Sequence, residues 1–202
     1  VRHSIMTSNQ RNWFVFLGAV AITALTSVLY FTAAGVSDET IRVTLRSSAH
    51  ASFITLLVVF VARPLRQLRP TPLTASLLSN RRLLGIAFAG IHTAHLGLIL
   101  LRDRLTADYC FSVIENALGG VIYLLIFLLF ATSFDGPARA LGPRNWRILH
   151  KLGLYAIFVA ALQTIVPDSR EQLVSINGAL TLLAVVALVI RLTVFLAKFR
   201  SA

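Results

Sequence analysis

Six apolar stretches, each close to the length that crosses a lipid bilayer, constrain this chain more than any other feature. They cover residues 13–31, 47–62, 83–101, 116–134, 152–166 and 173–190. A spanning helix needs about 20 mostly apolar residues, and soluble domains usually carry about 25% charged residues. This chain is 56% hydrophobic and only 13% charged. The sequence therefore predicts an all-α integral membrane protein, a six-helix transmembrane bundle formed by a single domain over residues 1–202.

Positive charges are distributed unevenly between the segments that connect these stretches. With a cytoplasmic N-terminus, 5 of the 19 Lys and Arg residues lie outside, namely Arg42, Arg46, Arg102, Arg104 and Arg170, and the other 14 lie inside. Such an excess on the inside is the usual signature of orientation. We therefore expect an N-in, C-in arrangement surrounded by membrane lipid, and we attribute the net charge of +11 to topology rather than to nucleic-acid binding.

The first apolar stretch follows two arginines and could be read as a signal peptide. It is longer than an ordinary signal core of about 7–15 residues, and Trp13 and Tyr30 near its ends are typical interface anchors. We expect it to be a retained helix.

Four of the five histidines lie within or at the edge of the apolar stretches: His50, His92, His95 and His150. Ionisable groups in a bilayer are costly and usually face the bundle interior. Each could simply be a neutral imidazole bonded to a neighbouring helix. No Asp or Glu lies in the middle of a stretch, although a proton relay or a small transporter would normally supply carboxylates there. Imidazoles without carboxylates favour a metal centre, and b-type haem is the common membrane case.

The rise of about 1.5 Å per residue in a helix gives the depth of each histidine. Counted from the nearest inner-face arginine, His50 and His95 each lie 13 residues into the bilayer, or about 20 Å. His92 lies one turn from His95 on a similar face, whereas His150 lies at the inner boundary. Depth alone therefore favours His50 with His95 as a pair of haem ligands and disfavours His95 with His150.

Two stretches carry a resemblance to a known family. One runs from Arg63-Pro64-Leu65-Arg66 through Arg81-Arg82-Leu83-Leu84-Gly85 to His95, and the other contains Thr132-Ser133, Gly136, Leu141-Gly142, Trp146 and Leu149-His150. Together they resemble the ferric reductase-like transmembrane domain over roughly residues 45–165. Within that family the chain is most similar to the haem-binding membrane subunits of periplasmic methionine sulfoxide reductase systems.

The resemblance implies a six-helix bundle that holds b-type haem, one or two, between the third and fifth spans. It places the third-span ligand on His95 and the first fifth-span ligand on His150, whereas the second fifth-span position is Gln163. Because a carboxamide is a poor ligand for haem iron, four alternatives remain open. His50 replaces the missing imidazole, His92 compensates by a small rotation of its helix, the chain has lost haem, or the site is five-coordinate or otherwise unexpected. A lower third-span histidine, present in two-haem relatives, falls near Arg81 here.

The same resemblance implies the role of the protein. It indicates a multi-pass subunit of the bacterial inner membrane that carries electrons across or out of that membrane to a partner protein. The predicted metal ligands are His95, His50 and His150, with His92 as a further cofactor-binding residue. No flavin or nucleotide fingerprint occurs in the sequence, so the electrons would come from a redox partner, a larger membrane complex or quinol. The alternative is a haem-free structural subunit of a larger membrane complex that keeps the same fold.

Overall fold

The computed structural model describes residues 7–105, 113–171 and 175–200 of the chain, and all regular structure in these ranges is helical. The elements, in chain order, are α1 (Ser8–Ala34), α2 (Asp38–Leu68), α3 (Pro72–Ser79), α4 (Arg81–Leu105), α5 (Val113–Ala131), α6 (Asp135–Glu171) and α7 (Ile176–Arg200).

The helices agree with the predicted membrane protein class. In the described ranges, five helical segments are long and apolar enough to cross a bilayer: α1, α2, α4, the Asp135–Val166 part of α6 and the Ile176–Ala197 part of α7. The predicted stretch 116–134 coincides with α5, whose apolar portion, Ala117–Ala131, is shorter. The chain is therefore an all-helical, multi-pass membrane protein, and the sixth crossing remains a prediction.

Two helical features were not anticipated from the apolar stretches. α3 forms where the sequence analysis expects only a connecting segment. Its N-cap Thr71 accepts a hydrogen bond from Thr74 N, and Pro72 occupies its first turn, where a missing N–H costs nothing. α6 begins well before the predicted fifth span and is interrupted at Gly142, whose φ is 77° and ψ is 159°. Glycine adopts this left-handed conformation without the penalty of a Cβ, so it allows the sharp change of direction.

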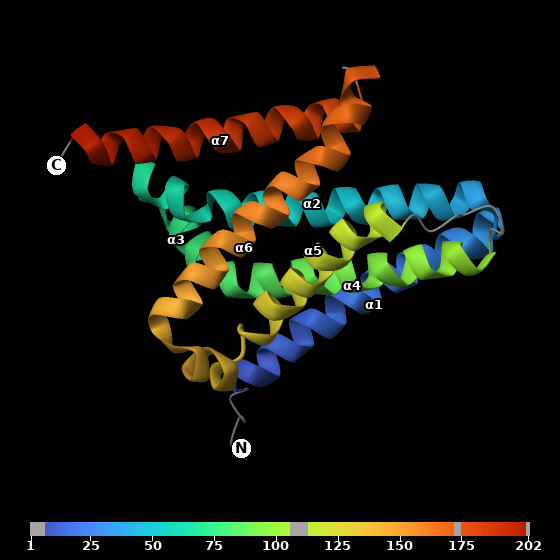
Figure 1. Cartoon of the computed structure of the whole chain (residues 1–202), viewed down its shortest axis with the longest axis horizontal. Helices are drawn as coiled ribbons and strands as arrows, with labels where there is room; N and C mark the ends of the chain where they lie inside the picture. The colour runs from blue at the N-terminus through green and yellow to red at the C-terminus, as the bar shows by residue number, and fades with distance from the viewer. Residues whose placement is uncertain (1–6, 106–112, 172–174, 201–202) are drawn as a thin grey trace.

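α2 lies at the centre of the helical arrangement. It packs against α1, α3, α4, α6 and α7, while α4 also packs against α1 and α6 packs against α5 and α7. In Figure 1, α3 and the C-terminal end of α7 lie toward the left, and α1 joins α2 at the right. The first turn of α1 also lies nearer the left-hand end. The two ends of the described chain therefore lie toward the same end of the bundle.

The interior contains tightly packed apolar side chains. The rings of Phe60 and Phe158 are 0% and 1% exposed and stack with their centroids 4.1 Å apart. The backbones of α1 and α4 approach closely at Gly90, where an added Cβ would lie 2.7 Å from Phe16 O and 2.9 Å from Ala19 Cβ. Large apolar side chains are exposed on the outside of every long helix, as expected where lipid surrounds a bundle.

A polar junction joins the starts of α1, α4 and α6. Arg82 Nη2 lies 2.9 Å from Asp135 Oδ1, and the other carboxylate oxygen of Asp135 accepts a hydrogen bond from the hydroxyl of Ser8. Asn12 Nδ2 donates to Ser133 O at 3.2 Å. Because these residues come from three helices, the junction fixes the α3-bearing end of the bundle.

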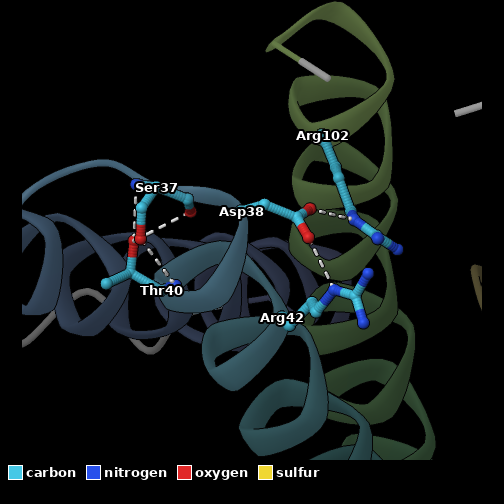
Figure 2. A network of polar contacts seen from close by, with 5 residues as sticks. All are labelled: Ser37, Asp38, Thr40, Arg42 and Arg102. Atoms are coloured by element: carbon cyan, nitrogen blue, oxygen red, sulfur yellow. Dashed lines mark hydrogen bonds and ion pairs between the residues drawn. The ribbon is translucent and has the colours of Figure 1, made fainter. Parts of the chain in front are cut away.

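A second polar junction lies at the opposite end of α4, where α2 begins. Figure 2 shows Asp38 between two arginines, with Arg102 Nε 2.8 Å from Oδ1 and Arg42 Nε 2.7 Å from Oδ2. Beside it, Ser37 and Thr40 form the capping box that starts α2. An acidic residue in the first turn also complements the positive end of the helix dipole. Asp38 therefore both starts α2 and ties it to the end of α4.

Candidate functional site

A cavity of about 670 Å³, which we call the inner cavity, lies between the helices. Leu78 and Ser79 of α3 line it, so it lies toward the α3-bearing end. Its apolar wall includes Leu56, Val59, Phe88, Ile126, Leu129, Leu154 and Ile157. Its charged wall consists of Arg63, Arg81, Arg82, Arg147, Lys151 and Arg191. Among the described residues that line it, His150 is the single histidine and there is no Asp or Glu. The inner cavity is therefore amphipathic and strongly cationic.

His150 is held in one orientation at the wall of the inner cavity. Its ring stacks on Trp146, one turn earlier on α6, with centroids 4.2 Å apart. The hydroxyl of Thr132 lies 3.0 Å from His150 Nε2 and donates to Leu128 O at 2.7 Å. With the hydroxyl proton directed to that carbonyl, Nε2 is the protonated nitrogen and donates to Thr132. Trp146 Nε1 donates to the carbonyl of the same threonine at 2.8 Å.

Two arginines of the cavity wall are anchored to the backbone of α2. Arg81 Nε donates to Val59 O at 3.1 Å. Arg191 on α7 donates from Nε and Nη2 to Phe60 O. Both side chains are half-buried, and their remaining N–H groups face no acidic partner among the described residues. The α2 carbonyls therefore position two guanidinium groups beside the cavity.

His95 lies higher on α4 and is oriented by α2. Its Nδ1 lies 2.8 Å from the hydroxyl of Ser48. Ser48 is 5% exposed, and its hydroxyl donates a hydrogen bond to Leu45 O at 2.9 Å. When the hydroxyl donates to this carbonyl, Nδ1 carries the proton and Nε2 has a free lone pair. Metal-bound histidines typically donate a hydrogen bond from their second ring nitrogen in this way. In that tautomer, His95 Nε2 would be the ring nitrogen able to bind a metal.

His92 lies next to His95 and is surrounded mainly by rings. The two rings lie 5.7 Å apart between centroids, and His92 also contacts Phe88 at 4.7 Å and Tyr123 at 5.7 Å. Its buried Nδ1 has no hydrogen-bond partner among the described residues. Since Phe88 also lines the inner cavity, α4 carries a continuous row of rings from that cavity up to His95.

His50 contacts a different helix from the one that carries His95. Its Nε2 lies 2.6 Å from Asn177 Oδ1 on α7. Gln163, the position where the family resemblance implies an imidazole, is exposed on α6. The structure thus brings His92 and His95 together, places His50 against α7 and places His150 at the inner cavity. Within residues 7–105, 113–171 and 175–200, no three His, Cys, Asp or Glu side chains cluster as a metal site. The ligand pairing remains a prediction.

Several residues of the site were not singled out for these roles by sequence reasoning. The sequence places Trp146 only within the family resemblance and Arg191 only among the inner positive charges, whereas both line the inner cavity. A signal was present for each of them. For Trp146, the signal is its position one helical turn before His150. For Arg191, the signal is Pro64, because a proline within a helix leaves one backbone carbonyl that needs another hydrogen-bond donor.

The comparisons with known proteins give one match. A family model described as ferric reductase like transmembrane component matches residues 48–162, more than half of the chain. The matched range begins on α2 at Ser48 and ends on α6 one residue before Gln163, and it includes His50, His92, His95 and His150. Neither a curated protein nor a solved structure matches.

Proposed function

The chain belongs to the ferric reductase-like transmembrane family, and from this premise we propose that it is a b-type haem-binding subunit that carries electrons to a partner protein. Family membership indicates a membrane electron-transfer component. The observation that carries the finer proposal is the orientation of His95, whose Nδ1 lies 2.8 Å from the buried Ser48 hydroxyl, which leaves Nε2 as the nitrogen that would bind the iron.

The residues around His95 fit an axial ligand of haem. The ring of His92 lies beside it, and the buried Nδ1 of His92 has no hydrogen-bond partner within the described ranges. An unsatisfied buried polar atom in a bundle interior is costly and calls for an explanation, and a nearby cofactor supplies one. Haem would supply one-electron chemistry. The protein would hold the iron through His95, set the ring orientation through Ser48 and keep water away with apolar side chains.

The second ligand remains the open part of this proposal. His50 is at matching depth by the sequence argument, but its Nε2 is engaged by Asn177, so ligation would require exchange of that hydrogen bond. His150 would similarly have to release Thr132. His92 needs no such exchange, because its Nδ1 has no partner in the described part of the chain. We therefore propose His95 as the primary ligand and test the other three histidines against it.

The test is a reduced-minus-oxidised absorption spectrum of purified protein and four single variants. Wild type should show b-type bands. His95→Ala should remove or strongly perturb them, because bis-imidazole ligation needs both axial nitrogens. The variant among His50→Ala, His92→Ala and His150→Ala that produces the same loss identifies the partner. His3→Ala is the control, because His3 lies outside the predicted spans, and its spectrum should be unchanged.

The alternative, a haem-free structural subunit of a larger membrane complex, has its own supporting observation. The exposed Gln163 replaces the expected second fifth-span ligand, and Arg81 stands near the expected lower third-span ligand. A wild-type protein that folds, reaches the membrane and shows no haem bands would establish this alternative. In that case none of the histidine variants should alter the absorption spectrum.

The electron donor would lie outside this chain. We propose that a redox partner protein, a larger complex or quinol delivers the electrons, and that the protein resides in the bacterial inner membrane. The haem-binding membrane subunits of methionine sulfoxide reductase systems are the functional parallel that we propose. Co-purification with a soluble periplasmic oxidoreductase, lost when the purified protein lacks haem, would support that assignment.

A further inference from the structure

We propose that the inner cavity binds an anionic phospholipid, with its phosphate among the cationic side chains and its acyl chains along the apolar wall. The site is separate from the His95 level and does not depend on haem being present.

Charge is the first argument for this site. Six cationic side chains and no Asp or Glu line the inner cavity within the described residues. Arg82 is compensated by Asp135, but Arg63, Arg147 and Lys151 form no ion pair with a described residue. These three side chains are exposed, whereas Arg81 and Arg191 are half-buried and so partly removed from water. A cluster of cations without acidic neighbours favours an anionic partner. Basic pockets between transmembrane helices on the cytoplasmic side are typical binding sites for phospholipid headgroups.

The geometry of the guanidinium groups is the second argument. Arg81 is anchored to a carbonyl of α2 through Nε, and Arg191 is anchored through Nε and Nη2, so their remaining terminal N–H groups are held in position. An arginine fork matches the geometry of phosphate oxygens. Because these two side chains are fixed before any ligand arrives, little conformational entropy is lost when a phosphate binds.

The shape of the wall selects an amphiphile over a small anion. Leu56, Phe88 and Leu154 belong to the apolar part of the same cavity, and neither inorganic phosphate nor glycerol phosphate would bury that surface. α3 and α7 contribute Leu78 and Phe195, from helices that carry lipid-exposed apolar side chains. A phospholipid offers both required parts, a charged headgroup and apolar chains.

Haem is the competing occupant of the inner cavity, but the residues that line the cavity fit it poorly. His150 is the single imidazole among the described lining residues, and its Nε2 is bonded to Thr132. Arg81 also lines the cavity and is bonded to Val59. The described lining residues therefore provide no second imidazole to complete the ligation of haem iron. They provide six cationic side chains, more than the two propionates of haem would pair with.

The test compares two triple variants with the same loss of charge. The cavity variant is Arg63→Gln/Arg147→Gln/Lys151→Gln. The control is Arg69→Gln/Arg139→Gln/Arg144→Gln, which removes three exposed arginines that do not line the cavity. Each protein in neutral detergent is titrated with phosphatidylglycerol, phosphatidylcholine or glycerol phosphate, and the apparent Kd and Tm are measured.

Phosphatidylglycerol should raise the Tm of wild type and of the control triple, and its apparent Kd should be at least about tenfold weaker for the cavity triple. Phosphatidylcholine and glycerol phosphate should have little effect on any of them. Equal weakening in both triples would show general surface attraction and overturn the proposal, as would equal binding of glycerol phosphate. Loss of haem bands in the cavity triple, with lipid binding unchanged, would assign the cavity to haem instead. The same titration of His95→Ala should match wild type, which separates this proposal from the haem proposal.

Discussion

The guanidinium of Arg191 donates two hydrogen bonds to the carbonyl oxygen of Phe60, from Nε at 3.1 Å and from Nη2 at 2.9 Å. This carbonyl lacks an ordinary helical partner, because the residue four positions later is Pro64, which has no N–H. The guanidinium also lies 3.8 Å from the centroid of the Phe60 ring and 4.8 Å from that of Tyr155. One side chain of α7 therefore compensates the proline defect of α2 and joins α2, α6 and α7.

The first prediction concerns this compensation. Arg191→Met keeps an apolar stem but leaves Phe60 O without a donor, and an unsatisfied buried carbonyl costs about 1–3 kcal/mol. We expect a corresponding decrease in the free energy of unfolding in detergent. In a Pro64→Ala background, the new N–H can reach Phe60 O, so Arg191→Met should cost less.

The double-mutant cycle decides whether proline is the cause. Coupling of at least about 0.5 kcal/mol is expected for residues that share one acceptor. Strictly additive effects would show that Arg191 acts through something other than the Pro64 defect. Leu192→Met is the control, since Leu192 is exposed on the same helix and should tolerate the change.

The second prediction concerns the contact of α1 with α4. Gly90→Ala should reduce the free energy of unfolding by about 1–3 kcal/mol, because the added methyl meets the backbone oxygen of Phe16 and forces the helices apart. Gly97→Ala on the same helix is the matched control. A Cβ at Gly97 meets nothing within 4 Å, and alanine is the better helix former, so stability should be unchanged or slightly higher. Equal loss from both substitutions would contradict the close-packing argument.

Hydropathy predicts the membrane class and most helix locations, because bilayer length restricts the possible solutions so strongly. It does not predict α3 or the early start of α6, since both depend on local signals rather than on long apolar runs. Thr71 with Pro72 starts one helix, and Gly142 with its φ of 77° redirects the other. The hydropathy of a helix also does not indicate which neighbouring helix it contacts. The close approach of α1 to α4 at Gly90 therefore could not be predicted from the sequence.

The candidate site was predicted in part. The sequence singles out four histidines, and residue counting predicts their depth. It could not give their partners, because a depth fixes position along a helix and leaves the rotation about its axis free. That rotation directs His50 to Asn177 and His95 to Ser48. The cationic cavity was missed for a similar reason, since its wall combines side chains from α2 to α7.

The third prediction tests the orientation of His95. Ser48→Ala removes the hydrogen-bond partner of Nδ1, and loss of such a supporting contact typically weakens metal binding about 10- to 100-fold. We expect lower haem retention and a shifted midpoint potential, with the protein still folded. Ser47→Ala is the matched control, because Ser47 is exposed and its hydroxyl bonds only to Val43 O among the described residues. An unchanged potential in Ser48→Ala would mean that this contact does not act on a cofactor.

The last prediction concerns orientation in the membrane. The excess of Lys and Arg in alternate connecting segments predicts that both ends are cytoplasmic. The Asp38–Arg102 junction lies at the end of α4 opposite the Arg82–Asp135 junction. Reporter fusions after Arg42 and Arg104 should therefore report the outer side, and a fusion at Ala202 should report the inner side. Because α5 is short for a spanning helix, the fusion at Ala202 is the sensitive one. If α5 does not cross the bilayer, the number of crossings becomes odd and the reporter at Ala202 must appear outside.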